Sequence, residues 1–163
     1  MNIFFLDFNP NVAAKYHCDK HVVKMILETA QLLYTAHRVL GSTDLPDDAY
    51  RLAHKNHPCA IWARESIDNY IWLCQLGLAL CQEYRHRYGN KTHKTERHLL
   101  WLSEHPPALI PSIGVTTIRL AMPDEYKQSN PIESYRTYYI RAKLRFAKYT
   151  DREVPEFLKI HIK

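Results

Sequence analysis

Apolar residues between positions 10 and 40 recur at intervals of three and four, which places them on one side of an α-helix. This pattern predicts one long helix over residues 10–40, ended by Gly41, because glycine commonly follows the last helical turn. A second helical pattern covers residues 58–88, where Pro58 suits a first helical position. The intervening segment, residues 42–57, predicts a loop with one short helix at about 46–54.

The C-terminal part of the chain predicts two more helices around an irregular segment. A short helix is expected over residues 95–103, and residues 105–131 then hold five prolines, which favour irregular or extended structure. Asn130 as cap, Pro131 in the first turn and Glu133 three residues after the cap predict the start of a last helix.

This last helix is expected to run to about residue 148, before a polar tail that contains Pro155. Taken together, the patterns predict an all-α fold. We expect a compact single domain over residues 1–163, with one proline-rich irregular segment at about 105–131.

Composition narrows the class of protein. Low glycine content and ample aromatics exclude collagen-like and disordered classes. The chain has no apolar run long enough for a membrane helix, and its opening residues make a poor secretory signal, so we expect a soluble, cytoplasmic protein without a membrane partner. The four cysteines form no CxxC pair and are expected to be reduced and structural.

Positive charge is concentrated near the C-terminus. The net charge is +5, and residues 127–163 hold all of this excess, with nine Lys or Arg against four Asp or Glu. The last residue, Lys163, is one of the nine. Such a segment is typical of a protein that binds a phosphate-rich partner, or else of a solvated basic helix.

The first long helix carries a polar stripe. Its members are spaced four, three, four, three and four residues apart and so share one face: His17, His21, Lys24, Glu28, Gln31 and Thr35. They form either the solvent side of an amphipathic helix or a site in which Glu28 acts as an acid–base group. His17, His21 and Glu28 are also candidate metal ligands, but His17 and Glu28 lie about 10 Å apart along the helix axis, so no metal is expected.

The last predicted helix interleaves rings with cations. Rings can stack on bases while cations follow phosphates, so this helix is a candidate nucleic-acid-binding element. Its candidate contact residues are Tyr135, Arg136, Tyr138, Tyr139, Arg141, Lys143 and Arg145. Alternatively, some of these rings belong to the core while the cations face water.

Several motifs, in the same order along the chain, resemble a known family. Asp19-Lys20-His21 followed by Glu28 resembles the first helix of the phage-type pyrimidine-dimer DNA glycosylase/AP lyase family, the T4-like endonuclease V type. Three further segments resemble segments of that family's bacterial relatives: Asn56-His57-Pro58, the later Asn69-Tyr70 and residues 83–89. The aromatic stretch of residues 135–139 resembles one near that family's C-terminus.

The resemblance implies a compact all-α enzyme that needs no cofactor and acts on duplex DNA with damaged or modified bases. Family members extrude a nucleotide, attack its sugar C1′ with the chain's α-amine and cleave the backbone through a Schiff base. Free α-amines have a pKa of roughly 7.7–8.0, well below the value near 10.4 of a lysine, and so form imines readily at neutral pH. Carried over to this sequence, Glu28 is the catalytic carboxylate and the N-terminal residue is the nucleophile.

This sequence departs from the family pattern around that carboxylate. Asn2 usually leaves Met1 in place, so Met1 is the expected nucleophile, and Leu27 and Gln31 replace the family's bracketing arginines. Lys24 is then the one cation on that face, either as an alternative imine former or, with His21, as a phosphate ligand. The open alternatives are a related base-modifying enzyme, a non-catalytic nucleic-acid-binding module, or a metal-dependent enzyme that uses His17, His21 and Glu28.

Overall fold

The computed structural model describes residues 1–162; Lys163, counted above in the basic segment, lies outside the described residues. It is all-α, as predicted, with no strand in the described part of the chain. The helices are α1 (Pro10–Tyr16), α2 (Asp19–Val39), α3 (Pro58–Glu65), α4 (Ile67–Arg87), α5 (Glu96–Glu104), α6 (Pro131–Tyr138) and α7 (Glu156–Lys159). None of these helices is both long and apolar enough to cross a membrane.

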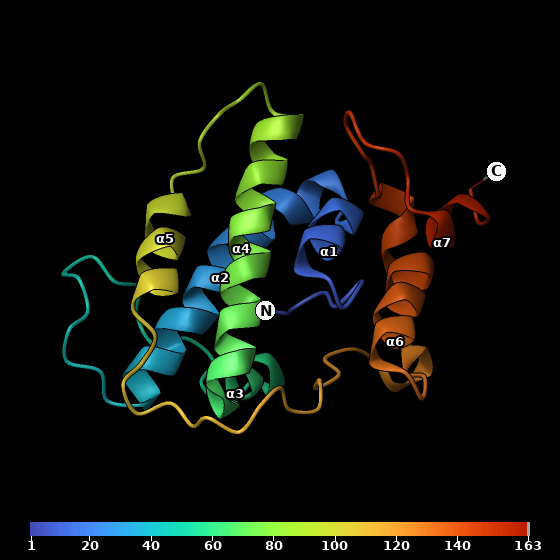
Figure 1. Ribbon diagram of the computed structural model, residues 1–163. Helices are drawn as coiled ribbons and strands as arrows, with labels where there is room; N and C mark the ends of the chain where they lie inside the picture. Colours follow the sequence, from blue (N-terminus) through green and yellow to red (C-terminus); the bar gives the residue numbers. More distant parts are fainter. Residues whose placement is uncertain (163) are drawn as a thin grey trace.

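Helix α4 stands at the centre of the fold. It packs against α1, α2, α3 and α5, and Figure 1 shows α5 on one side of it, α1 and α6 on the other and α2 behind. The first residues of the chain run into this assembly, where Ile3, Phe4, Phe5 and Leu6 are buried. The amino end of the chain is therefore held by the core.

The predicted helix over residues 10–40 is in fact two helices. The chain is extended at His17 and Cys18, which separate α1 from α2. Backbone groups released by this break find partners elsewhere: Arg87 donates to the carbonyls of Lys15 and His17, at 2.9 and 2.7 Å. The prediction of a continuous helix was wrong because these tertiary hydrogen bonds replace the helical ones.

The predicted helix over residues 58–88 is also interrupted. Ser66 separates α3 from α4, and its hydroxyl accepts a hydrogen bond from the amide of Asp68, which caps α4. The amide of Ile67 is bound to the carbonyl of Pro111 in the irregular segment. This segment thus helps to set where α4 begins.

Of the remaining predictions about secondary structure, some are confirmed and others are wrong. Asn130 caps α6 as expected, and the proline-rich segment is irregular apart from a 3₁₀ turn at Asp124–Tyr126. The short helix expected at about 46–54 is absent from that segment of the structure, which forms only a turn. After α6 the chain continues as a π-helical turn (Tyr139–Lys143) and a 3₁₀ turn (Leu144–Phe146), rather than as an α-helix to residue 148.

Candidate active site

A small cavity lies where the amino end of the chain meets α2 and the segment after α6. Its volume is about 130 Å³. It is lined by Met1, Asn2, Phe4, His21, Lys24, Met25, Glu28, Tyr138 and Lys143. All four residues expected from the sequence to be catalytic, Met1, His21, Lys24 and Glu28, are in this set.

Glu28 stands between two nitrogen atoms in this cavity. Its Oε1 atom lies 3.5 Å from the amino nitrogen of Met1, and its Oε2 atom lies 3.7 Å from Nζ of Lys24. The side chains of Glu28 and Met1 are 10% and 8% exposed, whereas that of Lys24 is 61% exposed. The carboxylate therefore lies between the amino group of a residue whose side chain is buried and the nitrogen of an exposed lysine side chain.

His21 forms the wall beside this group. Its ring stacks on Phe4 with centroids 4.4 Å apart, and its Nδ1 atom lies 2.6 Å from the hydroxyl of Tyr139. Burial, aided by the positive charges of Lys143 and Lys24, lowers the pKa of His21 to about 3. The ring is thus neutral near pH 7 and acts as a hydrogen-bonding group rather than a cation.

His17 lies in the break between α1 and α2 and not on the polar stripe. Its Nδ1 atom is 2.6 Å from the carbonyl of Ala13, its Nε2 atom is buried without a partner, and burial lowers its pKa to about 4. In residues 1–162 no group of three or more His, Cys, Asp or Glu side chains is arranged to hold a metal ion. Within these residues, His17, His21 and Glu28 are thus not grouped as the ligands of one ion.

His57 is a neighbour of the amino end that the sequence did not assign to the site. Its Nδ1 atom accepts a hydrogen bond from the amide of Cys59 at 3.1 Å. Burial first, and then the positive charge of the amino terminus, lower the pKa of His57, while Glu28 and the backbone of Met1 raise it. The Asn56-His57-Pro58 motif was the signal that could have placed this residue here.

Aromatic rings and cations border the cavity. Nζ of Lys143 lies 4.7 Å from the centroid of the Tyr138 ring, and the ring of Tyr126 stacks on that of Tyr138 with centroids 5.4 Å apart. Nζ of Lys20 lies 4.7 Å from the centroid of the Phe146 ring. Rings with cations above them are suited to stack on bases and to approach phosphates.

The other rings predicted to contact nucleic acid lie in the core. Tyr135 and Tyr139 are fully buried, which corrects the expectation that they meet DNA. Arg136 is half-buried and bound to the carbonyl of Leu6 and the carboxylate of Asp7. By contrast, Arg141 and Arg145 are exposed and remain able to meet a phosphate.

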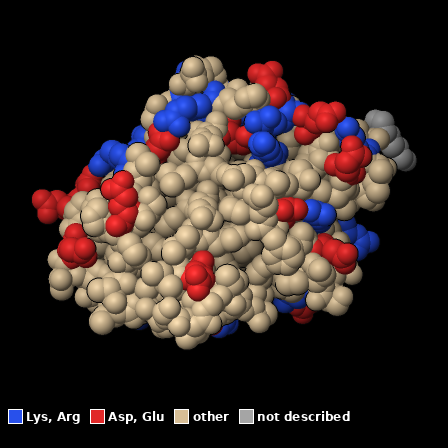
Figure 2. Space-filling model, viewed as in Figure 1, with Lys and Arg blue, Asp and Glu red and all other residues tan. Residues whose placement is uncertain are grey.

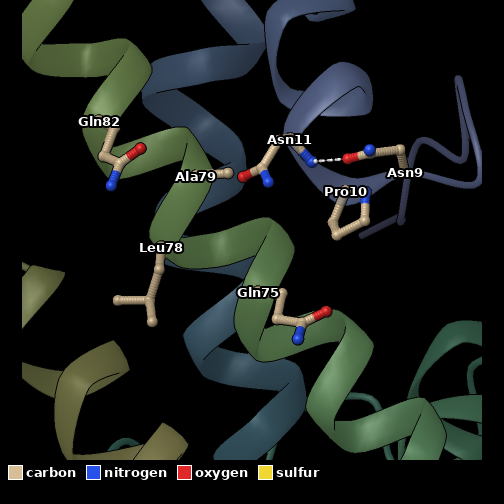
Figure 3. A pocket seen from close by; sticks show the side chains of 7 residues that line it. All are labelled: Asn9, Pro10, Asn11, Gln75, Leu78, Ala79 and Gln82. Atoms are coloured by element: carbon tan, nitrogen blue, oxygen red, sulfur yellow. Dashed lines mark hydrogen bonds between the residues drawn. The ribbon is translucent and has the colours of Figure 1, made fainter.

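Two other surfaces lack the required groups. A larger cavity of about 490 Å³ lies between α1 and α4, but Figure 3 shows only amide and apolar side chains around it, such as Asn11, Gln75 and Leu78. The face of the molecule in Figure 2 is largely uncharged across its centre, with Lys and Arg gathered near the upper edge. A phosphate backbone would find few partners on the centre of that face.

The fold and the cavity define a helical protein with a buried carboxylate, two amines and a cationic, aromatic border. The family model for pyrimidine dimer DNA glycosylases matches residues 1–97, more than half of the chain, and the chain belongs to that family. It is a DNA base-excision enzyme, and DNA is its partner. Neither the curated proteins nor the solved structures include a match.

The matched range covers only one part of the cavity. Met1, His21, Lys24 and Glu28 fall within residues 1–97, whereas Tyr138 and the residues that follow it lie outside.

Proposed function

We propose that this chain is a DNA glycosylase/AP lyase for duplex DNA containing pyrimidine dimers, with the α-amine of Met1 as nucleophile and Glu28 as acid–base group. The observation that carries the proposal is the distance of 3.5 Å between the Met1 amino nitrogen and Oε1 of Glu28. An amine beside a carboxylate is the pair of groups that imine formation at a sugar carbon needs.

In the first step the amine nitrogen bonds to C1′ of the damaged nucleotide while the glycosidic bond breaks and the base leaves with its electron pair. The carboxylate of Glu28 stabilises positive charge that develops on the sugar and takes a proton from the attacking nitrogen. When the protonated carboxyl returns that proton to O4′, the sugar ring opens and C1′ becomes an iminium carbon.

The iminium then permits strand cleavage. Loss of a proton from C2′ sends electrons toward C3′, and the C3′–O bond breaks with the phosphate as leaving group. Water finally hydrolyses the imine and restores the amine. Each step uses Glu28 as the proton carrier, because it is the acid–base group that faces the amine.

Lys24 and His21 support this chemistry in different ways. Lys24 is more than half exposed, which suits it to meet a DNA phosphate at the cavity entrance and to hold the Glu28 carboxylate from the other side. His21 is neutral and is fixed by Tyr139, which suits it to donate or accept a hydrogen bond without adding charge. Lys24 remains the rival imine former, and the location of the covalent adduct separates the two amines.

DNA contact is proposed for the border of the cavity. Tyr138 and Phe146 offer partly exposed rings, and Lys143, Arg141 and Arg145 offer positive charge next to them. An extruded nucleotide would stack on these rings while its flanking phosphates meet the cations.

The test is a single-turnover assay on a duplex with one abasic site and on a duplex with one cyclobutane dimer. Glu28→Gln should lower strand cleavage about 100-fold or more, because general acid–base groups contribute roughly 10²–10⁴-fold. DNA affinity should stay close to that of the parent protein, and the exposed control Glu104→Gln should cleave normally. Full activity of the folded Glu28→Gln variant would refute the proposed role.

A further inference from the structure

The side chain of Asn2 is held by several partners next to the reactive end of the chain. Its Nδ2 atom donates to the carbonyl of Ala121 at 2.8 Å, and its Oδ1 atom accepts from the amide of Ile3 at 2.8 Å. The same oxygen lies 3.2 Å from the hydroxyl of Tyr135 and 3.6 Å from Sγ of Cys59. Both polar ends of this amide are therefore satisfied.

These partners come from separate parts of the fold. Cys59 lies at the start of α3, Ala121 in the irregular segment and Tyr135 in α6. The side chain of Met1 packs against the core on the other side of the same peptide bond. The polar contacts of Asn2 and the apolar contacts of Met1 thus restrict how far the amino nitrogen can move from Glu28.

We infer that Asn2 is a positioning residue, whose side-chain hydrogen bonds hold the α-amine of Met1 against Glu28. The inference rests on the proposed function, because it concerns the placement of the proposed nucleophile. Placement matters at this scale, since a shift of about 1 Å in a reacting group can cost roughly 100-fold in rate.

An amide is required at this position for a chemical reason. The nitrogen must donate to Ala121 while the oxygen accepts from Ile3 and Tyr135. A carboxylate of the same shape would turn an acceptor toward the carbonyl of Ala121. An apolar side chain of similar size would remove the hydrogen bonds of Asn2 to the Ala121 carbonyl and the Ile3 amide, whereas the Tyr135 hydroxyl would keep its contact with the Arg119 carbonyl.

The experiment compares Asn2→Asp and Asn2→Leu with the parent protein. Both substitutions put a large residue second, so that Met1 is expected to be retained, and intact mass verifies this for each sample. The readouts are the rate of borohydride-trapped adduct formation at saturating abasic-site DNA, the Kd for that DNA, and the melting temperature. Asn11→Asp, at an exposed position of α1, is the matched control.

We expect both Asn2 variants to lose at least tenfold in trapping rate, with Kd changed less than twofold and the protein folded at the assay temperature. A merely structural role would instead lower the melting temperature and leave the rate per folded molecule unchanged. Tyr135→Phe, which removes one partner of Oδ1, should lose severalfold in rate, and it decides the matter if neither Asn2 variant folds.

The outcomes separate this inference from the proposed function. If the parent protein is active and the folded Asn2 variants trap DNA at the parental rate, the inference alone is overturned. If neither Asn2 variant folds, a parental rate for Tyr135→Phe has the same meaning. A parent protein that forms no adduct at all would overturn the proposed function and the inference together.

Discussion

Acidification should destabilise this protein through two buried histidines, His21 in the candidate site and His17 in the break between α1 and α2. Burial lowers the pKa of His17 to about 4 and that of His21 to about 3, against an ordinary value near 6.5. On unfolding, both rings would take up protons at a higher pH than they do in the folded state. Their contribution to stability is therefore present above about pH 6.5 and is lost as the pH falls toward the folded values.

The size of this effect follows from the gap between folded and unfolded values. Near pH 5 both rings are still neutral in the folded chain but mostly protonated in the unfolded one. Proton linkage then gives a loss of roughly 2 kcal/mol per histidine between about pH 7 and about pH 5. The loss depends mainly on the unfolded value, because the pKa of each folded ring lies below this window.

The assay is urea unfolding at a series of pH values for the parent protein, His17→Gln and His21→Gln. Each variant should be less stable than the parent protein near pH 7, and its free energy of unfolding should then fall less steeply below about pH 6.5. The difference between parent and variant should shrink by roughly 2 kcal/mol on going to about pH 5. Most carboxylates titrate below this window and so contribute little to the comparison.

His161→Gln is the control, because His161 is exposed near the C-terminus and its ring is solvated in both states. It should leave the pH dependence unchanged. Equal pH dependence of the parent protein and both buried-histidine variants would refute the reasoning, since it would mean that these rings bind protons equally in the folded and unfolded chains.

Three further substitutions test other parts of the account. Arg87→Met should lower the free energy of unfolding by about 3–5 kcal/mol, because it removes one of the two arginines bound to buried Glu83 and the donor of two backbone carbonyls. The exposed ion pair lost in Arg97→Met should cost less than about 1 kcal/mol, and similar losses for the two variants in urea unfolding would contradict this. Lys143→Gln should reduce the slope of log Kd for duplex DNA against log salt by about 0.9, and an unchanged slope would mean that Lys143 meets no phosphate. Tyr138→Leu should weaken binding of abasic-site DNA by roughly 1–3 kcal/mol through lost stacking, measured by fluorescence anisotropy, and parental affinity would exclude base contact by this ring.

The helix content and the central residues of the site were predictable from the local sequence, whereas the breaks between helices were not. The three- and four-residue spacing places His21, Lys24 and Glu28 on one face of α2 whatever surrounds it. The interruption at His17 depends on Arg87, about 70 positions along the chain, whose hydrogen bonds no local pattern reveals. The apolar periodicity continues across the break and so hides it.

The roles of the aromatic rings in α6 and in the turn that follows it were partly predictable from their spacing. Tyr135 and Tyr139 are four residues apart and share the face that is buried, whereas Tyr138 lies on another face and lines the cavity. Interleaving of rings and cations alone could not tell these faces apart. The approach of His57 to Met1 required the packing of α3 against α2, which brings together residues distant in sequence.

The most direct test of the central claim is to find which nitrogen atom becomes bound to DNA. The protein is incubated with an abasic-site duplex and borohydride, the adduct is digested, and the modified peptide is identified by mass spectrometry. We predict that the sugar is attached to the α-amine of Met1 and that Lys24→Arg still forms the adduct. Attachment to Lys24, or no adduct from a folded, DNA-binding protein, would contradict the account.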